Sequence, residues 1–274
     1  MRDLGKDINI TINGLTVSYI DDGPEEAPVI IFIHGFPFNK LMWHLQTEAL
    51  KEKYRVLAYD IRGFGNSDAG MEEFSIGLFV SDLLSLMDTL KIKQAVLCGL
   101  SMGGYIALHA IESYPERFSG LVLADTNCLA DSAEAKDKRM KTIERIRENG
   151  IEKYADESLN KLFAPESFTN NLAGISDARE MILKTPEQSL YRTLHALSER
   201  KETCGKLPEI SVPVHIFVGK EDIITPLDAS HHMHEKIKHS VLFIIDHAGH
   251  LSNLENPWAF NYRLKKFMSS IKSI

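Results

Sequence analysis

Cysteine is scarce in this chain, and its few cysteines are scattered. Only three of the 274 residues are cysteine, namely Cys98, Cys128 and Cys204, and none of them forms a C-x-x-C pair. Disulfide frameworks and cysteine-based zinc sites usually show more cysteines at shorter spacings. The pattern therefore predicts neither, and a reducing, cytoplasmic location is expected.

Long apolar runs are missing as well. No stretch approaches the length of a transmembrane helix. Residues 1–11 are polar and contain no apolar core of signal-peptide length. The sequence therefore predicts no membrane partner and no export signal in these residues.

Positive charge is in deficit. The chain carries 31 Lys and Arg residues against 38 Asp and Glu residues, which gives a formal net charge of −7. A nucleic-acid surface or a polybasic membrane anchor needs an excess of cations, so neither is expected. What the chain does contain is 44% hydrophobic residues, enough for a large core in a globular protein.

Short apolar runs alternate with amphipathic segments along most of the chain. Residues 8–12 and 15–21 alternate apolar and polar side chains around Asn13-Gly14, which predicts a β-hairpin. Unbroken apolar runs predict strands buried on both faces, and they lie at residues 29–33, 54–59, 95–98, 121–124, 214–218 and 241–245. Helical spacing predicts helices that include residues 41–52, 76–90 and 258–271. This order predicts an α/β fold with a mostly parallel, doubly wound sheet.

Residues 131–206 interrupt this alternation. They are charged, show helical periodicity and contain no convincing strand. We expect a helical cap here, inserted before the last two strands of a core domain formed by residues 1–130 and 207–274. Apolar residues at helical spacing should pack this cap and leave a small, largely apolar pocket suited to short acyl chains; they are Ile143, Ile146, Leu159, Leu162, Phe163, Met181 and Ile182.

A Gly-x-Ser-x-Gly pattern lies where an apolar run passes directly into a helical run. Residues 99–103 read Gly-Leu-Ser-Met-Gly, with Ser101 at the centre. A strand that turns at once into a helix strains the residue at the bend, and glycines on both sides relieve crowding there. This context is typical of a nucleophile elbow. The structural alternative is that Ser101 caps the following helix.

A nucleophilic serine needs an imidazole base that is oriented by an acid. The apolar run at 214–218 is followed by Glu221 and Asp222, at the edge where a parallel strand ends. We favour Asp222 because it leads into the loop at residues 223–226, whereas Glu221 lies nearer the strand. Asp125, after the preceding strand, stays an alternative, although it could also cap its own loop.

Two histidines follow the last predicted strand. His250 comes after Gly249 on a loop that can reach inward, and His247 lies closer to the strand. We therefore favour His250 as the base and assign His247 a structural hydrogen bond.

An oxyanion needs two backbone N–H donors. One should be Met102, which follows the nucleophile, and the other should come from the loop after residues 29–33. Phe36 is the best position in that loop, and His34 is expected to have a structural role, bonding to neighbouring loops.

Five motifs together carry a family resemblance. They are residues 34–37 (His-Gly-Phe-Pro), 60–67 (Asp-Ile-Arg-Gly-Phe-Gly-Asn-Ser), 99–104 (Gly-Leu-Ser-Met-Gly-Gly), 219–222 (Gly-Lys-Glu-Asp) and 249–250 (Gly-His). From about residue 14 to residue 267 the chain resembles the α/β-hydrolase superfamily. It is similar to small bacterial serine hydrolases that include 3-oxoadipate enol-lactonases and carboxylesterases.

This resemblance implies the role of each site residue. Ser101 would be the nucleophile, Asp222 the orienting acid and His250 the base, while the N–H groups of Phe36 and Met102 would hold the oxyanion. The implied activity is hydrolysis of a small ester or lactone, with no cofactor and no metal. Alternatives on the same triad are carbon–carbon bond hydrolysis and acyl transfer, and a slow-turnover ligand-binding signalling protein is the alternative from another class.

A second cluster of titratable residues lies at His231, His232, His234 and His239. Only His231 and His234 would share a face of a helix. We expect a solvated helix here rather than a metal site.

Overall fold

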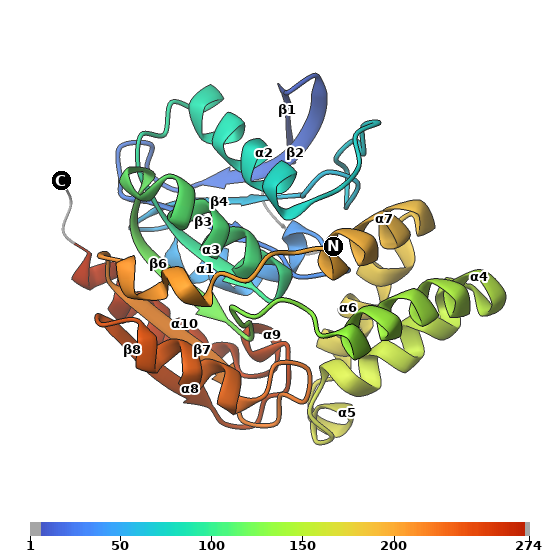
Figure 1. The fold of residues 1–274 in the computed structure, drawn as a ribbon. Coiled ribbons are helices and arrows are strands. Elements are labelled where there is room, and N and C mark those ends of the chain that lie inside the picture. The colour runs from blue at the N-terminus through green and yellow to red at the C-terminus, as the bar shows by residue number, and fades with distance from the viewer. Residues whose placement is uncertain (1–6, 272–274) are drawn as a thin grey trace.

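Eight strands form one sheet in the computed structural model, which describes residues 7–271 of the chain (Figure 1). Their order across the sheet is β1-β2-β4-β3-β5-β6-β7-β8. The first two strands run antiparallel to their neighbours, and all pairs from β4 to β8 are parallel. The strands are β1 (Ile8–Ile12), β2 (Leu15–Asp22), β3 (Val29–Ile33), β4 (Arg55–Tyr59), β5 (Ala95–Leu100), β6 (Phe118–Ala124), β7 (Val214–Gly219) and β8 (Ser240–Ile245). The predicted mostly parallel α/β sheet is therefore confirmed.

The predicted hairpin is present at the start of the sheet. Ile12 pairs with Leu15 across a two-residue turn. Asn13 and Gly14 both have positive φ values, 48° and 75°. Such values match the right-handed twist of the two strands, which is why an Asn-Gly pair is favoured there.

Helices cover both faces of the sheet. Apolar residues of α2, α3 and α8 pack on one face, and those of α1 and α10 pack on the other. These helices and the short ones beside them are η1 (Lys40–Trp43), α1 (His44–Leu50), α2 (Ile76–Thr89), α3 (Met102–Ser113), η2 (Pro115–Arg117), α8 (Leu227–Lys236), α9 (Ser252–Glu255) and α10 (Pro257–Ser270). The helix expected at residues 41–52 begins as a 3₁₀ turn. The Asn39 side chain caps this turn by accepting a hydrogen bond from the Leu41 N–H.

Residues 131–206 lie between β6 and β7 and are called the insertion below. All of their regular secondary structure is helical. Its helices lie together at one side of the sheet (Figure 1). They are α4 (Ala133–Leu162), α5 (Ser167–Asn170), α6 (Leu172–Lys184) and α7 (Glu187–Ser198), and η3 (Cys204–Glu209) leads back to the sheet. The long helix α4 is interrupted at Gly150, whose φ of 80° is open to glycine without strain.

The apolar residues expected to pack the insertion do so in two groups. Ile143 and Ile146 contact Leu190 and Leu194 of α7 in a small separate cluster. The other five, from Leu159 to Ile182, join the main core on the α1 and α10 face of the sheet. The second half of α4 and helix α6 of the insertion therefore share a hydrophobic core with the sheet.

Cys128 and Cys204 form a disulfide, which the scattered cysteine pattern did not predict. They are 76 residues apart in the sequence, with Cys128 shortly before the insertion and Cys204 near its end, and their Cα atoms lie 4.9 Å apart. These ends converge because β6 and β7 are neighbouring strands, and sequence spacing does not record that convergence. Cys98 is free and buried in β5, as expected. The cysteines thus lend no support to the predicted cytoplasmic location, which stays a prediction.

Within residues 7–271, none of the helices combines the length and the apolar character needed to cross a membrane.

The glycine after the bend at Ser101 provides a test of the packing. A Cβ added at Gly103 would collide with the carbonyl oxygen of Ile33 in β3. We expect Gly103→Ala to lower the free energy of unfolding by at least about 2 kcal/mol, measured by urea denaturation. Gly77→Ala in α2 is the control, because the nearest atom to its new Cβ lies 3.9 Å away. Equal midpoints for the two variants would contradict this account.

Candidate active site

Ser101 lies at the bend between β5 and α3. Its backbone has φ 53° and ψ −113°, a strained conformation for a residue with a side chain. The Ser101 N–H donates to the Ala124 carbonyl at 3.0 Å, and the Thr126 hydroxyl donates to the Ser101 carbonyl at 2.8 Å. The bend is therefore held from the next strand, as a nucleophile elbow requires.

The alternative role of Ser101, side-chain capping of α3, is not supported by the geometry. The Ser101 side chain makes no capping hydrogen bond to the first turn of the helix. Ser101 is half-buried and lines a cavity. Its hydroxyl is therefore left available for a molecule in that cavity.

Asp222 and His250 form a buried pair at the same edge of the sheet. Asp222 follows β7 and His250 follows β8, and the His250 Nδ1 lies 2.8 Å from the Asp222 Oδ2. Asp222 also accepts hydrogen bonds from the Ile224 N–H at 2.8 Å and from the Thr225 hydroxyl at 2.6 Å. These contacts hold the carboxylate in place and leave the other imidazole nitrogen, Nε2, free to exchange a proton.

Charge balance within this pair favours an ionised Asp222. Burial alone raises the pKa of Asp222, but attraction to His250 and the hydrogen bonds from His250 and Thr225 outweigh it, so the pKa lies below its usual 3.8. Burial alone lowers the pKa of His250, but the charge and hydrogen bond of Asp222 outweigh it, so the pKa lies above 6.5. The imidazolium form is thus stabilised, which favours proton uptake by His250.

The other candidate acids make different contacts. Glu221 is exposed to solvent. Asp125 is fully buried and accepts hydrogen bonds from the Gly219 N–H and the Ser252 hydroxyl, and the structure shows no hydrogen bond from it to His250. Burial and the nearby charge of Asp222 raise the pKa of Asp125 well above its usual value. Asp125 therefore ties β6 to the end of β7 and the start of α9.

His247 and His34, for which structural roles were expected, both contact other loops of the protein. His247 is exposed, and its Nδ1 lies 2.7 Å from the Glu166 Oε1 of the insertion. His34 is fully buried between two loops. Its Nδ1 lies 3.0 Å from the Gly35 carbonyl and its Nε2 accepts a hydrogen bond from the Ile61 N–H. Burial lowers the pKa of His34 to about 4, so the ring is neutral.

Two backbone N–H groups are available beside Ser101. Phe36 and Met102 both line the cavity that Ser101 and His250 line. Within residues 7–271, neither N–H donates to a protein acceptor. Met102 begins α3, and the first N–H groups of a helix have no partner within the helix. The described lining of the cavity thus includes two residues whose backbone N–H groups have no protein acceptor.

The cavity has a volume of about 320 Å³ and lies between the sheet edge and the insertion. Most of its lining is apolar, as expected, but charged side chains border it as well. Apolar side chains such as Leu162, Leu194 and Leu197 are present, but the insertion also contributes Lys138, Arg139, Arg145, Lys161 and Glu157. These charged side chains come from α4, one face of which borders the cavity.

Two contributors to the site were not singled out from the sequence. Thr225 holds Asp222, and its position three residues after an Asp is a local hydrogen-bonding pattern that could have indicated it. Glu255 accepts hydrogen bonds from the Ala164 N–H and the Ser167 hydroxyl of the insertion and from the Gly249 N–H beside His250. No local pattern marks Glu255, because its partners are distant in the chain or belong to another loop.

Several known proteins are similar to this chain over nearly its whole length. The chain is 30% identical to 3-oxoadipate enol-lactonase 1 of Acinetobacter baylyi over 94% of this chain and 95% of that protein. A thermophilic esterase from Thermogutta terrifontis, solved with malate bound, superimposes with a TM-score of 0.92 at 31% identity, over 98% of this chain and 100% of that one. The enol-lactonase from Burkholderia xenovorans LB400 gives 0.89 at 27% identity, over 96% and 100%.

A family model is matched across most of the chain. The model describes the alpha/beta hydrolase fold, and it matches residues 28–257. This range runs from the start of β3 to the start of α10 and contains Ser101, Asp222 and His250. The chain belongs to the alpha/beta hydrolase fold family.

Proposed function

We propose that this protein hydrolyses a small carboxylic ester or lactone through an acyl-enzyme on Ser101. The observation that carries the proposal is the buried Asp222–His250 pair, since His250 lines one cavity together with Ser101, Phe36 and Met102. The names of the similar proteins, enol-lactonase and esterase, support the same reaction class.

In the proposed cycle Ser101 attacks, His250 transfers protons and two backbone N–H groups bind the oxyanion. His250 takes the proton from the Ser101 hydroxyl as the oxygen attacks the carbonyl carbon. The N–H groups of Phe36 and Met102 hold the oxyanion, and His250 then returns the proton to the leaving oxygen. His250 next takes a proton from water, which attacks the acyl-enzyme, and gives that proton to the Ser101 oxygen as the acid leaves. Protons move only between the chain, the substrate and water, so this cycle uses no cofactor.

The insertion serves as the cap in this proposal, over a core domain of residues 1–130 and 207–274. The cap proposal is supported by the cavity, whose walls come from both parts. Glu255 and the bond from the His250 N–H to the Leu162 carbonyl, 2.8 Å long, join the cap to the catalytic loop.

The cavity lining favours a substrate that carries a negative charge away from the reacting carbonyl. Four cationic side chains line it against one acid, Glu157. Lys138 pairs with Glu134 and Arg139 pairs with Asp131, whereas Arg145 lies 3.8 Å from Glu157, the loosest of these pairs. Lys161 forms no ion pair within residues 7–271, so Lys161 and Arg145 are the cations with most charge to spare. The Thermogutta esterase was solved with malate, a dicarboxylate, which agrees with this preference.

Removal of the nucleophile should abolish activity and leave the fold intact. We expect Ser101→Ala to lower kcat by up to about a million-fold on p-nitrophenyl butyrate, since the hydroxyl supplies the attacking oxygen. Ser158→Ala, another serine lining the cavity, is the control and should stay within a few-fold of the wild-type rate. Substantial turnover by purified Ser101→Ala would disprove the mechanism.

Asp222→Asn should lower kcat by roughly ten-thousand-fold, because the amide no longer selects the active tautomer of His250. Glu221→Gln and Asp125→Asn should be mild, since Glu221 is exposed and Asp125 has no bond to His250. A severe loss in Asp125→Asn with Asp222→Asn near normal would move the acid to β6.

The same pair sets the pH dependence. The base must be neutral, and Asp222 raises the pKa of His250, so kcat/KM of the wild type should fall as pH decreases through a value above 6.5. Without the Asp222 charge, burial dominates and the acid limb should move to lower pH in Asp222→Asn. An unmoved acid limb would show that another group titrates.

Charge reversal at the cavity tests the substrate proposal. We expect Arg145→Glu/Lys161→Glu to lower the ratio of kcat/KM for p-nitrophenyl hemiadipate to that for p-nitrophenyl hexanoate by about three- to tenfold at low salt. Lys153→Glu is the control, because Lys153 is an exposed residue of α4 that does not line this cavity. An equal change in the control would mean that net charge, and not the cavity, is responsible.

A further inference from the structure

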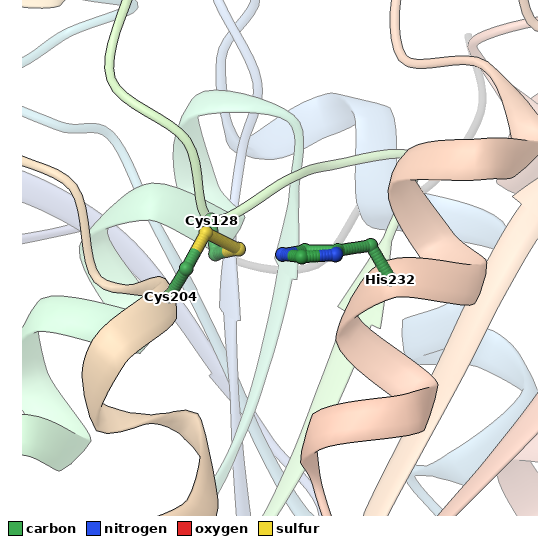
Figure 2. A group of neighbouring side chains, drawn as sticks. All are labelled: Cys128, Cys204 and His232. Carbon is green, nitrogen blue, oxygen red and sulfur yellow. A yellow bond between two sulfur atoms is a disulfide. The ribbon is translucent and has the colours of Figure 1, made fainter.

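The disulfide at the base of the insertion has a histidine beside it. Cys128 follows β6, Cys204 begins η3, and His232 comes from α8 (Figure 2). The two sulfurs and a ring nitrogen of His232 all lie within 4.8 Å of one another. Figure 2 shows the His232 ring pointing from its helix toward the sulfur pair.

We propose that, once the disulfide is reduced, Cys128, Cys204 and His232 bind a thiophilic metal ion of the zinc type. Two thiolates and one imidazole are the ligands that zinc prefers, and a water molecule would complete the tetrahedron. The base of the insertion is thus closed by a disulfide in one redox state and by a metal ion in the other. This site is separate from the Ser101 cavity and does not rest on the proposed function.

The distances suit a tetrahedral ion. Zinc binds sulfur at about 2.3 Å and imidazole nitrogen at about 2.0–2.1 Å, so the ligand atoms of a tetrahedral site lie roughly 3.5–3.8 Å apart. The three ligand atoms already lie within 4.8 Å of one another. Loss of the sulfur–sulfur bond lets the two sulfurs separate toward the distance that the ion requires.

The two cysteines are held together by more than their own bond. The Thr203 N–H donates to the Cys128 carbonyl at 2.9 Å, and the Arg200 Nε donates to the Leu129 carbonyl at 3.2 Å. Cys128 and Cys204 are both buried. These backbone contacts do not depend on the oxidation state of sulfur, so the reduced thiols stay close to each other and lose little entropy on binding an ion.

His232 is suited to complete the site. It is half-buried, and within residues 7–271 its ring has no hydrogen bond or ion pair. Its neighbours on α8 differ: His234 Nδ1 lies 2.8 Å from the Ser240 hydroxyl, and His231 is exposed. The sequence pattern pointed to His231 and His234 as the pair sharing a face, but the ring beside the sulfurs is that of His232.

The redox step is balanced by an external reductant. A dithiol supplies two electrons and its two thiol protons and becomes a disulfide itself. A phosphine supplies two electrons and takes its oxide oxygen from water, whose two protons complete the two thiols. Binding of the metal ion then displaces the two thiol protons to solvent. A small disulfide such as oxidised glutathione accepts the two electrons in the reverse step and becomes two thiols, so the Cys128–Cys204 bond forms again and the ion is released.

The test is a metal titration of the full chain in both redox states. Protein reduced with a phosphine, and freed of reductant without oxygen, is titrated with Co²⁺ while thiolate-to-cobalt absorption is recorded, and bound Zn²⁺ is counted by elemental analysis. We expect one ion per reduced chain and none per oxidised chain. An oxidised protein that binds as much as the reduced one would overturn the proposal without any variant.

Variants identify the ligands. Cys204→Ser should lose the cobalt absorption, and His232→Gln should weaken binding by at least about tenfold. His231→Gln on the same helix is the matched control and should bind as the wild type does. Circular dichroism checks that each variant is folded. Reduced wild type that binds no more Co²⁺ than Cys204→Ser, or His231→Gln that weakens binding as much as His232→Gln, would disprove the site.

Discussion

The close approach of backbone at the bend after β5 is the constraint on which the candidate site depends. A Cβ at Gly99 would collide with Gly103, and a Cβ at Gly103 would collide with Ile33 of β3. Because the main chains meet without intervening side chains, the turn is tight enough to hold Ser101 at φ 53° with its side chain at the cavity. The same contact places the start of α3, with its unpaired N–H groups, beside that side chain.

The histidine end of the site depends on the insertion. The His250 N–H donates to the Leu162 carbonyl, and the Glu255 carboxylate joins Ala164 of the insertion to Gly249. Movement of the insertion would therefore move the imidazole as well as the cavity wall. This coupling explains how a segment that contributes no member of the proposed triad can still affect its geometry, and it makes the closure at Cys128 and Cys204 relevant to the whole insertion.

Most strands, the elbow and the favoured acid and histidine were predictable because each is marked by a local pattern. Buried parallel strands need unbroken apolar runs, and the carboxyl ends of those runs meet at one edge, so Ser101, Asp222 and His250 had to converge. The catalytic roles of these residues stay predictions. The identity of the acid was less certain from the residues alone, because Glu221 and Asp125 also follow predicted strands. Burial excludes only Glu221, and hydrogen-bond partners separate the other two: Asp125 bonds to Gly219 and Ser252, and Asp222 bonds to His250.

The sequence by itself therefore determined the order of strands and helices and the side chains available at the carboxyl edge. Tertiary structure alone decided which distant residues meet: Cys128 with Cys204 and His232, Glu255 with the insertion, and the cations of α4 with the cavity. The reason is physical. Periodicity records which face of an element is buried, but contacts between segments tens of residues apart arise only when the adjacent strands bring their connecting loops together.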